Sequence, residues 1–412
     1  MTWDVVVAGA GPAGAATAIH LARRGFCVCL LDRARFPREK PCGEFLSPAG
    51  TPLLEELGVR EAVEAAGARR LARVRIVVPG ERPLDLTIPG PSGDKWGYSL
   101  SRRRLDAILV DAARRAGAEV REGMRVVEVV HAAGRVAGVT ARPEEGGTEE
   151  VRARLVVGAG GRNCPVARAL GLQRRQRRRR YDLLAHWGPA PVAGAGRGRE
   201  DEIEPVCELV VGADEYVAAA PIENGRRNVN CVVPQEALRR TPEAGIVYRR
   251  TVGRLLAGSS WTEGSPDEDV VASDVTPLRT RRATADGAFL VGDSALFLDP
   301  FTGQGLYLAL RSAALAAPVA AAALKAGRTG REQLAEYDRR RDVEFGNKLR
   351  VSRAIQTILY RPRLARRVVG ALRRDAALSV TLAEVTGDLV PAHRVWSPGF
   401  GLRLARAAIG RR

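Results

Sequence analysis

Four residues near the start of the chain have the types and spacing to bind a dinucleotide. Gly9, Gly11 and Gly14 follow the apolar run Asp4–Ala8, and Asp32 lies 18 residues beyond the last glycine. In a strand–turn–helix unit, the first glycine allows a tight turn, the second lets backbone approach a pyrophosphate, and the third permits close helix–strand packing. The acid accepts hydrogen bonds from the adenosine ribose. The sequence therefore predicts a dinucleotide site, which also includes Pro12, Ala13 and Arg33.

A second group of residues with chemical potential lies far downstream. Gly292 and Asp293 end a short apolar stretch, and Gly303 and Gly305 precede a helical pattern that begins at Leu306. An acid at a strand end can bind a sugar-alcohol hydroxyl, and glycine N–H groups at a helix start can face an electron-rich ring edge. An ordinary strand–loop–helix connection would carry the same pattern. By itself, the motif leaves both a nicotinamide and a flavin dinucleotide open.

The elements that position the first site follow from hydrophobic periodicity. Strands over 4–8 and 26–31 flank a helix with apolar residues at Ala15, Ala18, Ile19 and Ala22. A second amphipathic helix begins near Leu105 and ends at Gly117. Three strands, over 126–130, 136–141 and 151–157, are separated by glycine turns and predict a meander.

The rest of the chain has shorter signals. We expect a loop over 36–44, a half-exposed strand over 72–78 and a turn-rich break over 89–94. Further strands are predicted over 209–211, 216–220, 228–233 and 288–291. The helix that starts at Leu306 should kink or end at Pro318, and basic helices should follow residue 330.

Composition narrows the class of protein. With 412 residues, 45% hydrophobic and 5% aromatic, the chain predicts an α/β protein of two or three domains. The longest apolar run, 313–324, is shorter than a membrane span, and no targeting segment is evident, so we expect a cytoplasmic protein. The net charge of +18 comes almost wholly from arginine. It reflects either solvated arginines or attraction to an anionic partner, and no nucleic-acid-binding module accompanies it.

The six cysteines show neither a CxxC pair nor nearby histidines at metal spacing. We therefore expect no metal site and no disulfides. Cys27 and Cys29 should lie on one buried face of the second strand. Cys42 either packs as a small hydrophobe or borders the reactive site.

The ordered motifs of the chain resemble the aromatic-hydroxylase-like flavoproteins. The resemblance rests on the first glycine turn with Asp32, on Arg102–Asp106, on Gly158–Arg162 and on Gly292–Gly305. Within that superfamily, the chain is most similar to the geranylgeranyl-reductase-related branch. Two segments carry this closer similarity: Phe36–Glu44, which contains Pro-Arg-Glu-Lys-Pro-Cys-Gly-Glu, and Val385–Ala392.

The resemblance implies a discontinuous FAD-binding domain with a Rossmann-like, three-layer ββα fold, formed by residues 1–70, 95–172 and 277–330. Residues 71–94 and 173–276 would form an inserted, mixed or antiparallel substrate-binding sheet, and residues 331–412 a C-terminal helical region. Asp32 would hold the adenosine ribose, and Asp293 the ribityl chain. Arg102 would approach the flavin's phosphate or ribityl region. The remaining cofactor contacts implied are Val126 at the adenine and Pro300, Gly303, Gly305 and Leu306 at the flavin ring.

By the same resemblance, Cys42, Gly43 and Glu44 would border the reactive face of the flavin as catalytic residues. The chain also departs from the family. Gly160 stands where these proteins have an aspartate, which puts ordinary NAD(P)H handling in question. The reductase motif Tyr-x-Trp-x-Phe-Pro is replaced by Tyr216-Val-Ala-Ala-Ala-Pro221, so the lipid pocket should be wider. The Trp-x-Trp-x-Ile-Pro motif of flavin halogenases is absent, which disfavours halogenation.

Histidines and arginines suggest further roles. His20 and His131 should be structural, whereas His186 and His393 are candidates for proton transfer. The basic run 174–180 fits either a solvated loop or a surface for acidic headgroups, a pyrophosphate tail or an acyl carrier. The late arginines lie among apolar residues, which fits either a membrane-surface helix or a helix packed on the body: Arg361, Arg363, Arg366, Arg367, Arg373 and Arg374.

Together, these features predict an FAD-dependent oxidoreductase with NAD(P)H as electron donor. Its substrate would be a hydrophobic prenyl- or polyketide-like molecule, either free or linked to a carrier or phosphate. Flavin hydride transfer to a C=C bond is the leading prediction. The alternatives are an NAD(P)H-dependent flavin monooxygenase, acting as hydroxylase or epoxidase, and a catalytically idle FAD-binding protein. A peripheral membrane contact is compatible with each.

Overall fold

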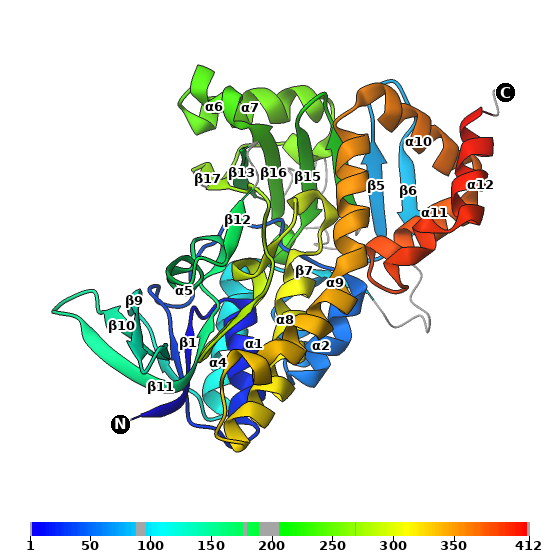
Figure 1. Cartoon of the computed structure of the whole chain (residues 1–412). Coiled ribbons are helices and arrows are strands. Elements are labelled where there is room, and N and C mark those ends of the chain that lie inside the picture. Colours follow the sequence, from blue (N-terminus) through cyan, green and yellow to red (C-terminus); the bar gives the residue numbers. More distant parts are fainter. Residues whose placement is uncertain (1, 88–95, 176–178, 189–205, 268, 410–412) are drawn as a thin grey trace.

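In a computed structural model, the chain is described over residues 2–87, 96–175, 179–188, 206–267 and 269–409. The predicted turn over 89–94, and Gln176, Arg177 and Arg178 of the basic run, lie outside these residues. Figure 1 shows a lower α/β body, an upper sheet and a C-terminal group of helices.

The lower body is organised around a mostly parallel sheet. Within the described residues it has eight strands: β1 (Trp3–Ala8), β2 (Val28–Leu31), β8 (Glu119–Arg121), β9 (Arg125–Ala132), β10 (Arg135–Arg142), β11 (Glu149–Gly158), β19 (Thr284–Ala285) and β20 (Ala288–Leu290). The central strand β1 runs parallel to both β11 and β2. β1 and β2 are apolar runs buried on both faces, as parallel strands require. The Rossmann-like prediction is confirmed.

Helices cover one face of this sheet, and a β-hairpin extends from the other side (Figure 1). The helices are α1 (Pro12–Ala22), α4 (Arg102–Arg115) and α8 (Gly305–Lys325), and α1 packs against both others. The predicted meander exists as β9, β10 and β11, but β11 also belongs to the main sheet. A short helix, α5 (Pro165–Ala169), follows β11.

Two smaller sheets connect the body to the upper sheet. One contains β3 (Phe45–Leu46), β4 (Arg69–Leu71) and β7 (Gly97–Ser99), beside α2 (Thr51–Glu56) and α3 (Arg60–Ala65). The other contains β12 (Gln173–Arg175), β18 (Leu278–Thr280) and β21 (Leu296–Phe297). The predicted substrate domain resumed at residue 173, the first residue of β12. β12 nevertheless pairs with strands near the second glycine motif and not with the upper sheet.

The upper sheet has seven strands within the described residues: β5 (Arg73–Val77), β6 (Leu84–Thr87), β13 (Arg180–Trp187), β14 (Val206–Val211), β15 (Tyr216–Pro221), β16 (Arg227–Pro234) and β17 (Val271–Asp274). Side chains alternate between its two faces. Leu183, Ala185 and Val229 face a core closed by α6 (Gln235–Arg240) and α7 (Ala244–Leu255). Asp182, His186 and Asn228 belong to the opposite face, toward the lower body.

The C-terminal region is helical, as predicted. It consists of α9 (Arg331–Leu359), α10 (Pro362–Arg374), α11 (Ala376–Thr386) and α12 (Pro398–Ile409). Ala365, Val369 and Leu372 of α10 are buried in a cluster that also contains Leu209 and Tyr216 of the upper sheet. The C-terminal helices therefore cover part of the face of that sheet that lies opposite α6 and α7.

Three local predictions were wrong or incomplete. Cys27 is exposed because β2 begins only at Val28, whereas Cys29 is buried. α8 continues through Pro318 to Lys325 and does not end there. By length and composition α8 passes the test for a membrane span, but 72% of the tested window is buried inside the molecule, as in a core helix.

Candidate functional site

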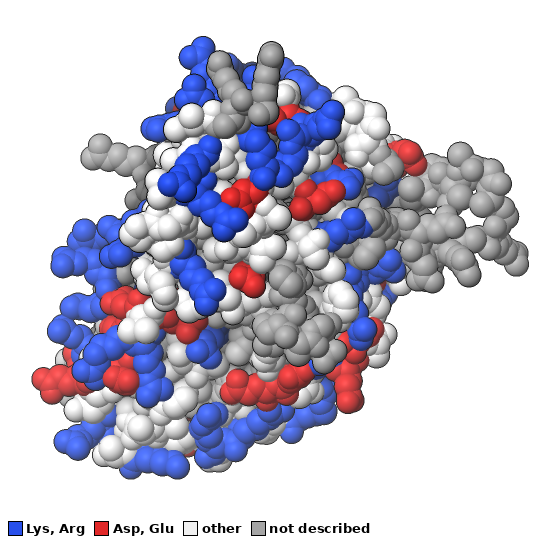
Figure 2. Space-filling view, turned by 90° about the vertical axis from the view of Figure 1, so that its right-hand side faces the viewer, with Lys and Arg blue, Asp and Glu red and all other residues white. Residues whose placement is uncertain are grey.

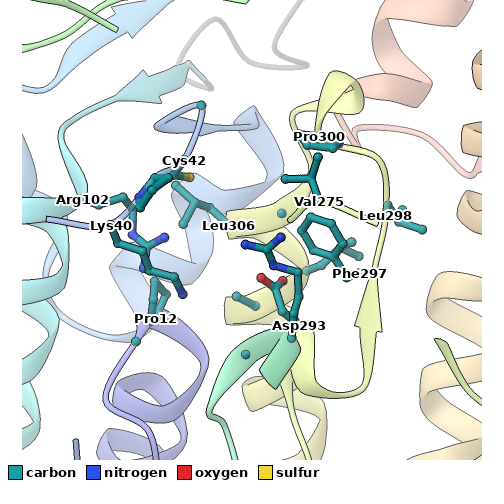
Figure 3. A pocket seen from close by; sticks show the side chains of 18 of the residues that line it. Pro12, Lys40, Cys42, Arg102, Val275, Asp293, Phe297, Leu298, Pro300 and Leu306 are labelled. Atoms are coloured by element: carbon teal, nitrogen blue, oxygen red, sulfur yellow. The ribbon is translucent and has the colours of Figure 1, made fainter. Parts of the chain in front are cut away.

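A cavity of about 1020 Å³, including space open to solvent, lies between the lower body and the upper sheet. Residues distant in sequence meet around it, as Figure 3 shows with Pro12, Lys40, Cys42 and Arg102 on one side and Asp293, Phe297 and Pro300 on the other. Its lining comes from both glycine motifs, from the Cys42 loop and from Asp182 of the upper sheet, so separate parts of the chain meet at one space.

Most of the residues predicted to bind the cofactor line this cavity: Gly11, Pro12, Ala13, Arg102, Asp293, Pro300, Gly303, Gly305 and Leu306. Cys42, Gly43 and Glu44 line it as well. The others lie elsewhere. Gly9 and Gly14 pack inside the first turn, Gly292 is buried under Asp293, Val126 is buried on β9, and Arg33 is exposed.

The first glycine turn has the geometry that the sequence predicted. Gly9 has a φ of 112°, and a Cβ at Gly14 would stand 1.8 Å from the Gly9 carbonyl oxygen. A Cβ at Gly11 would be 3.7 Å from Arg38 Nη2 and 3.9 Å from Arg102 Nη2. Two guanidinium groups and the N-terminus of α1 therefore face the same space. Such a cradle suits a pyrophosphate.

Asp32 has a structural task that the motif did not reveal. Its Oδ2 accepts a hydrogen bond from the Ala10 N–H at 2.7 Å, and its Oδ1 accepts one from the Ala34 N–H at 2.9 Å. The carboxylate therefore fixes the glycine turn from the end of β2. Asp32 does not line the cavity as the structure has it.

Buried ion pairs hold the two arginines of the cradle. Asp106 accepts from Arg102 through both oxygens, at 2.8 and 2.7 Å, and its Oδ2 lies 3.1 Å from Arg38 Nη2. Because one carboxylate serves two guanidinium groups, the cradle keeps excess positive charge. Lys40 adds to it. Burial, followed by the charge of Arg102, lowers the pKa of Lys40 to about 8.

The Cys42 loop is tied to the upper sheet through Glu44. One Glu44 oxygen accepts from the Arg102 N–H at 2.8 Å. The other shares a hydrogen bond with His186 Nε2 and accepts one from Asn228 Nδ2, both at 2.9 Å. Asn228 Nδ2 also donates to the Cys42 carbonyl at 2.8 Å. Asn228 begins a strand that the sequence predicts, but its role at the site was not predicted, because that role depends on the pairing of this strand with β13.

Cys42 itself borders the open part of the cavity. Burial raises the pKa of the Cys42 thiol, while the adjacent Arg102 opposes that change. A Cβ added at Gly43 or at Gly305 would meet no atom within 4 Å. Bare backbone from the Cys42 loop and from the start of α8 therefore lines free space, which suits the approach of a flat ring system. The residues present fit a flavin dinucleotide from the cradle to the α8 N-terminus.

The C-terminal segment supports the α8 end of the site. Asp388 Oδ1 accepts from Gln304 Nε2 at 2.7 Å and lies 3.0 Å from Lys348 Nζ, while its Oδ2 accepts from the Ser47 hydroxyl at 3.1 Å. Gln304 stands between the two glycines of the second motif. The segment 385–392, which resembles the reductase branch, thus holds the turn that carries the second glycine motif.

The remaining candidates are distributed as follows. His20 is buried on α1, whereas His131 and His393 are exposed. Arg180 is not part of a basic surface, because it is buried, pairs with Asp214 and stacks on Tyr360 at 4.0 Å. Arg174 and Arg179 are exposed. Among the described residues, no group of three or more potential ligands could hold a metal ion.

The fold and this site define a flavin-dinucleotide-binding oxidoreductase. Residues 2–348 match the family described as "FAD binding domain", and the chain belongs to that family. When bound, FAD supplies two-electron redox chemistry. The chain is therefore an FAD-dependent oxidoreductase.

The comparisons place the chain near named reductases. It is 31% identical over 351 residues to digeranylgeranylglycerophospholipid reductase 2 of Methanopyrus kandleri, covering 84% of each chain. It is 30% identical to menaquinone reductase of Mycobacterium tuberculosis, covering 76% of this chain and 75% of that one. A geranylgeranyl bacteriochlorophyll reductase-like structure from Thermoplasma acidophilum shares the fold, with a TM-score of 0.78, 22% identity and coverage of 93% and 96%.

Proposed function

We propose that this enzyme reduces carbon–carbon double bonds of a hydrophobic, prenyl-containing molecule. The observation that carries the proposal is the combination of a charged cradle and an apolar wall in one cavity. Arg38, Arg102 and Lys40 lie at the first glycine turn, whereas Val275, Phe297, Leu298 and Pro300 form the opposite wall (Figure 3). A hydrocarbon chain would lie on that wall beside the flavin ring.

Both relatives support this choice, because their names refer to reduction of lipids with isoprenoid groups. At the two positions where the reductase motif has large rings, this chain has Ala218 and Ala220. In the alternation of side chains along β15, both alanines lie on the face directed toward the lower body, and Ala218 remains partly exposed. We infer a roomier substrate space than the motif of the reductase branch would give. The electron donor of the proposed reaction is NAD(P)H.

The test is anaerobic. The FAD-loaded protein is titrated with NADPH or NADH, then mixed with a menaquinone bearing isoprene units or with a digeranylgeranylglycerol lipid. The proposal expects the flavin to bleach and then re-oxidise as the lipid gains two hydrogen atoms per bond, detected by mass spectrometry. Gain of an oxygen atom in air, without gain of hydrogen, would instead favour a monooxygenase. A flavin that neither donor reduces would contradict the choice of donor, and dithionite would then replace it.

We also propose a peripheral membrane contact through the C-terminal helices. α12 buries no residue fully, and Trp396, Leu402 and Ile409 are exposed. Lys and Arg side chains are spread over the face shown in Figure 2, including its upper part, where α10 and α12 lie. The apolar side of α10 itself is packed in the core, so the contact depends on α12 rather than on α10. Such a surface would give access to a lipid substrate from an anionic bilayer.

A further inference from the structure

A buried carboxyl group of the upper sheet remains without a task in the site described so far. Asp182 lies on β13, is 3% exposed and lines the cavity together with Cys42 and Asp293. In the strand alternation it shares the flavin-facing side with His186. The fold therefore buries an acid in the part of the cavity wall that the upper sheet provides, although burying an aliphatic residue there would cost less free energy.

The surroundings of Asp182 satisfy only half of its carboxyl group. Oδ1 accepts a hydrogen bond from Asn230 Nδ2 at 3.0 Å. Among the described residues, no hydrogen bond reaches Oδ2. Val275 comes directly after β17, which pairs with β13, and it lines the same part of the cavity. One oxygen is thus held in place, and the acid borders a cavity whose lining also includes apolar side chains suited to a hydrocarbon.

Burial, rather than the nearby charges, favours the protonated form of this acid. Arg162 and Asp299 are the charged cavity residues that act on it. Asp299 accepts from Tyr216 at 2.8 Å, from Gln356 at 2.8 Å and from Tyr360 at 3.1 Å. Burial raises the pKa of Asp182 to about 6, and Asp299 adds to the rise, while Asn230 and Arg162 oppose it. The other titratable groups coupled to it are Tyr216, Cys231 and Tyr248.

The other acids of the cavity are less suited to deliver a proton. Glu44 and His186 hydrogen-bond to each other, and Glu44 has two further donors. Lys40 lies with Arg102 at the charged cradle. The Cys42 thiol is the remaining competitor, and burial raises its pKa.

We propose that Asp182 is the catalytic acid of this site and protonates one carbon of the substrate double bond. The inference rests on the proposed reductase function. The proton leaves the Asp182 carboxyl group for one alkene carbon, and the other carbon accepts a hydride from the reduced flavin. The alkene gains two hydrogens, the flavin is oxidised by two electrons, and solvent reprotonates the Asp182 carboxylate.

The first experiment compares Asp182→Asn with Cys42→Ser in single turnovers of pre-reduced, FAD-loaded protein with the menaquinone probe. General acids contribute about 10²–10⁴-fold to rate, so Asp182→Asn should lose at least about 100-fold. It should also lose the fall in rate above about pH 6, where the wild-type acid ionises. Glu208→Gln, on β14 and facing away from the cavity, is the matched control and should keep both rate and profile. A wild-type rate and profile in Asp182→Asn, or loss of the profile only in Cys42→Ser, would overturn the proposal.

The second experiment needs no turnover. The absorbance spectrum of bound FAD is followed from about pH 5 to about pH 8, a range that contains no unperturbed carboxyl pKa. The wild type should show one transition near pH 6 that Asp182→Asn lacks, with FAD affinity changed less than about threefold, well under one hydrogen bond. A transition that persists in Asp182→Asn would overturn the assignment. If the wild type shows the Asp182-dependent transition but reduces neither lipid probe, the proposed reaction fails while the ionising acid beside the flavin stands.

Discussion

At the cavity, four carboxylates of similar chemistry differ in what surrounds them. Glu44 and Asp299 have their oxygens engaged by protein donors, so each fixes a loop. Asp182 is half satisfied and buried. Asp293 faces the open space near Lys40, whose charge it balances. Asp293 is therefore the carboxylate that remains available to a ribityl hydroxyl.

Replacing Asp293 by alanine should weaken FAD binding about tenfold or more. A hydrogen bond to a charged group contributes about 1.5–3 kcal/mol, and about 1.4 kcal/mol corresponds to a factor of ten. The dissociation constant is measured by quenching of FAD fluorescence during titration of the apoprotein. Asp111→Ala removes an exposed aspartate on α4 and should leave affinity unchanged. Full FAD occupancy in the Asp293 variant would contradict the assignment.

The raised pKa of Asp182 also predicts how the free energy of unfolding depends on pH. The pKa of Asp182 is raised from 3.8 to about 6 in the folded chain, so the folded state holds the proton longer than the unfolded state does. The contribution of Asp182 to the free energy of unfolding is therefore complete below about pH 4 and declines as pH rises to about 6. Asp182→Asn should show less of this decline and be more stable than wild type at pH 7, by an amount on the order of 1–3 kcal/mol. Urea denaturation at about pH 4 and at about pH 7, which bracket the transition, checks the sign.

At the scale of elements, the C-terminal segment supports the turn before α8, which carries the second glycine motif. Thr386 ends α11, and the left-handed Asp388 (φ 61°) then turns its carboxylate toward Gln304, Ser47 and Lys348. The three partners come from the turn before α8, from the loop after β3 and from α9. The C-terminal helices thereby help to position the turn before α8 and the loop after β3, which come earlier in the sequence.

Asp388→Ala should loosen this support. Gln304 and Lys348 would lose a buried acceptor, which costs several kcal/mol when a charged partner stays behind. We expect a clear fall in melting temperature and FAD binding weaker by about tenfold, equivalent to one such hydrogen bond. Asp375→Ala, which removes the N-cap of α11, is the matched control. It should lower stability by about 1 kcal/mol and leave FAD affinity unchanged. Equal effects of the two variants on FAD affinity would show that Asp388 acts only on the stability of the helices.

At the scale of the whole molecule, the site exists only where three separate parts meet. The lower body gives the charged cradle, the upper sheet gives Asp182 and His186, and the C-terminal helices cover part of the face of that sheet opposite α6 and α7. The outermost of these helices, α12, has no fully buried residue. That arrangement leaves α12 available for a surface contact without disturbing the cavity.

The membrane proposal is tested with vesicles containing anionic phosphatidylglycerol. Arg394 and Arg406 are exposed, and each arginine near an anionic surface contributes about 1 kcal/mol. The double substitution to glutamine should weaken sedimentation with vesicles about tenfold or more, and added salt should weaken the wild type similarly. Leu402→Ser with Ile409→Ser tests the apolar part. Arg142→Gln, exposed on β10, is the control. Unchanged binding in both double variants would exclude α12 as the contact.

The sequence by itself determined the nucleotide-binding frame. The glycine spacing, the strand and helix over 4–22 and the motif at 292–305 depend on local sterics and periodicity, which are written in consecutive residues. Only the tertiary structure decided what lies opposite the cofactor. The roles of Asn228, Asp182 and Asp388 arise from pairing of strands and packing of segments up to 341 residues apart, as between Ser47 and Asp388. A carboxylate's task depends on the neighbours that desolvate it or bind it, and those neighbours are fixed only when the chain folds.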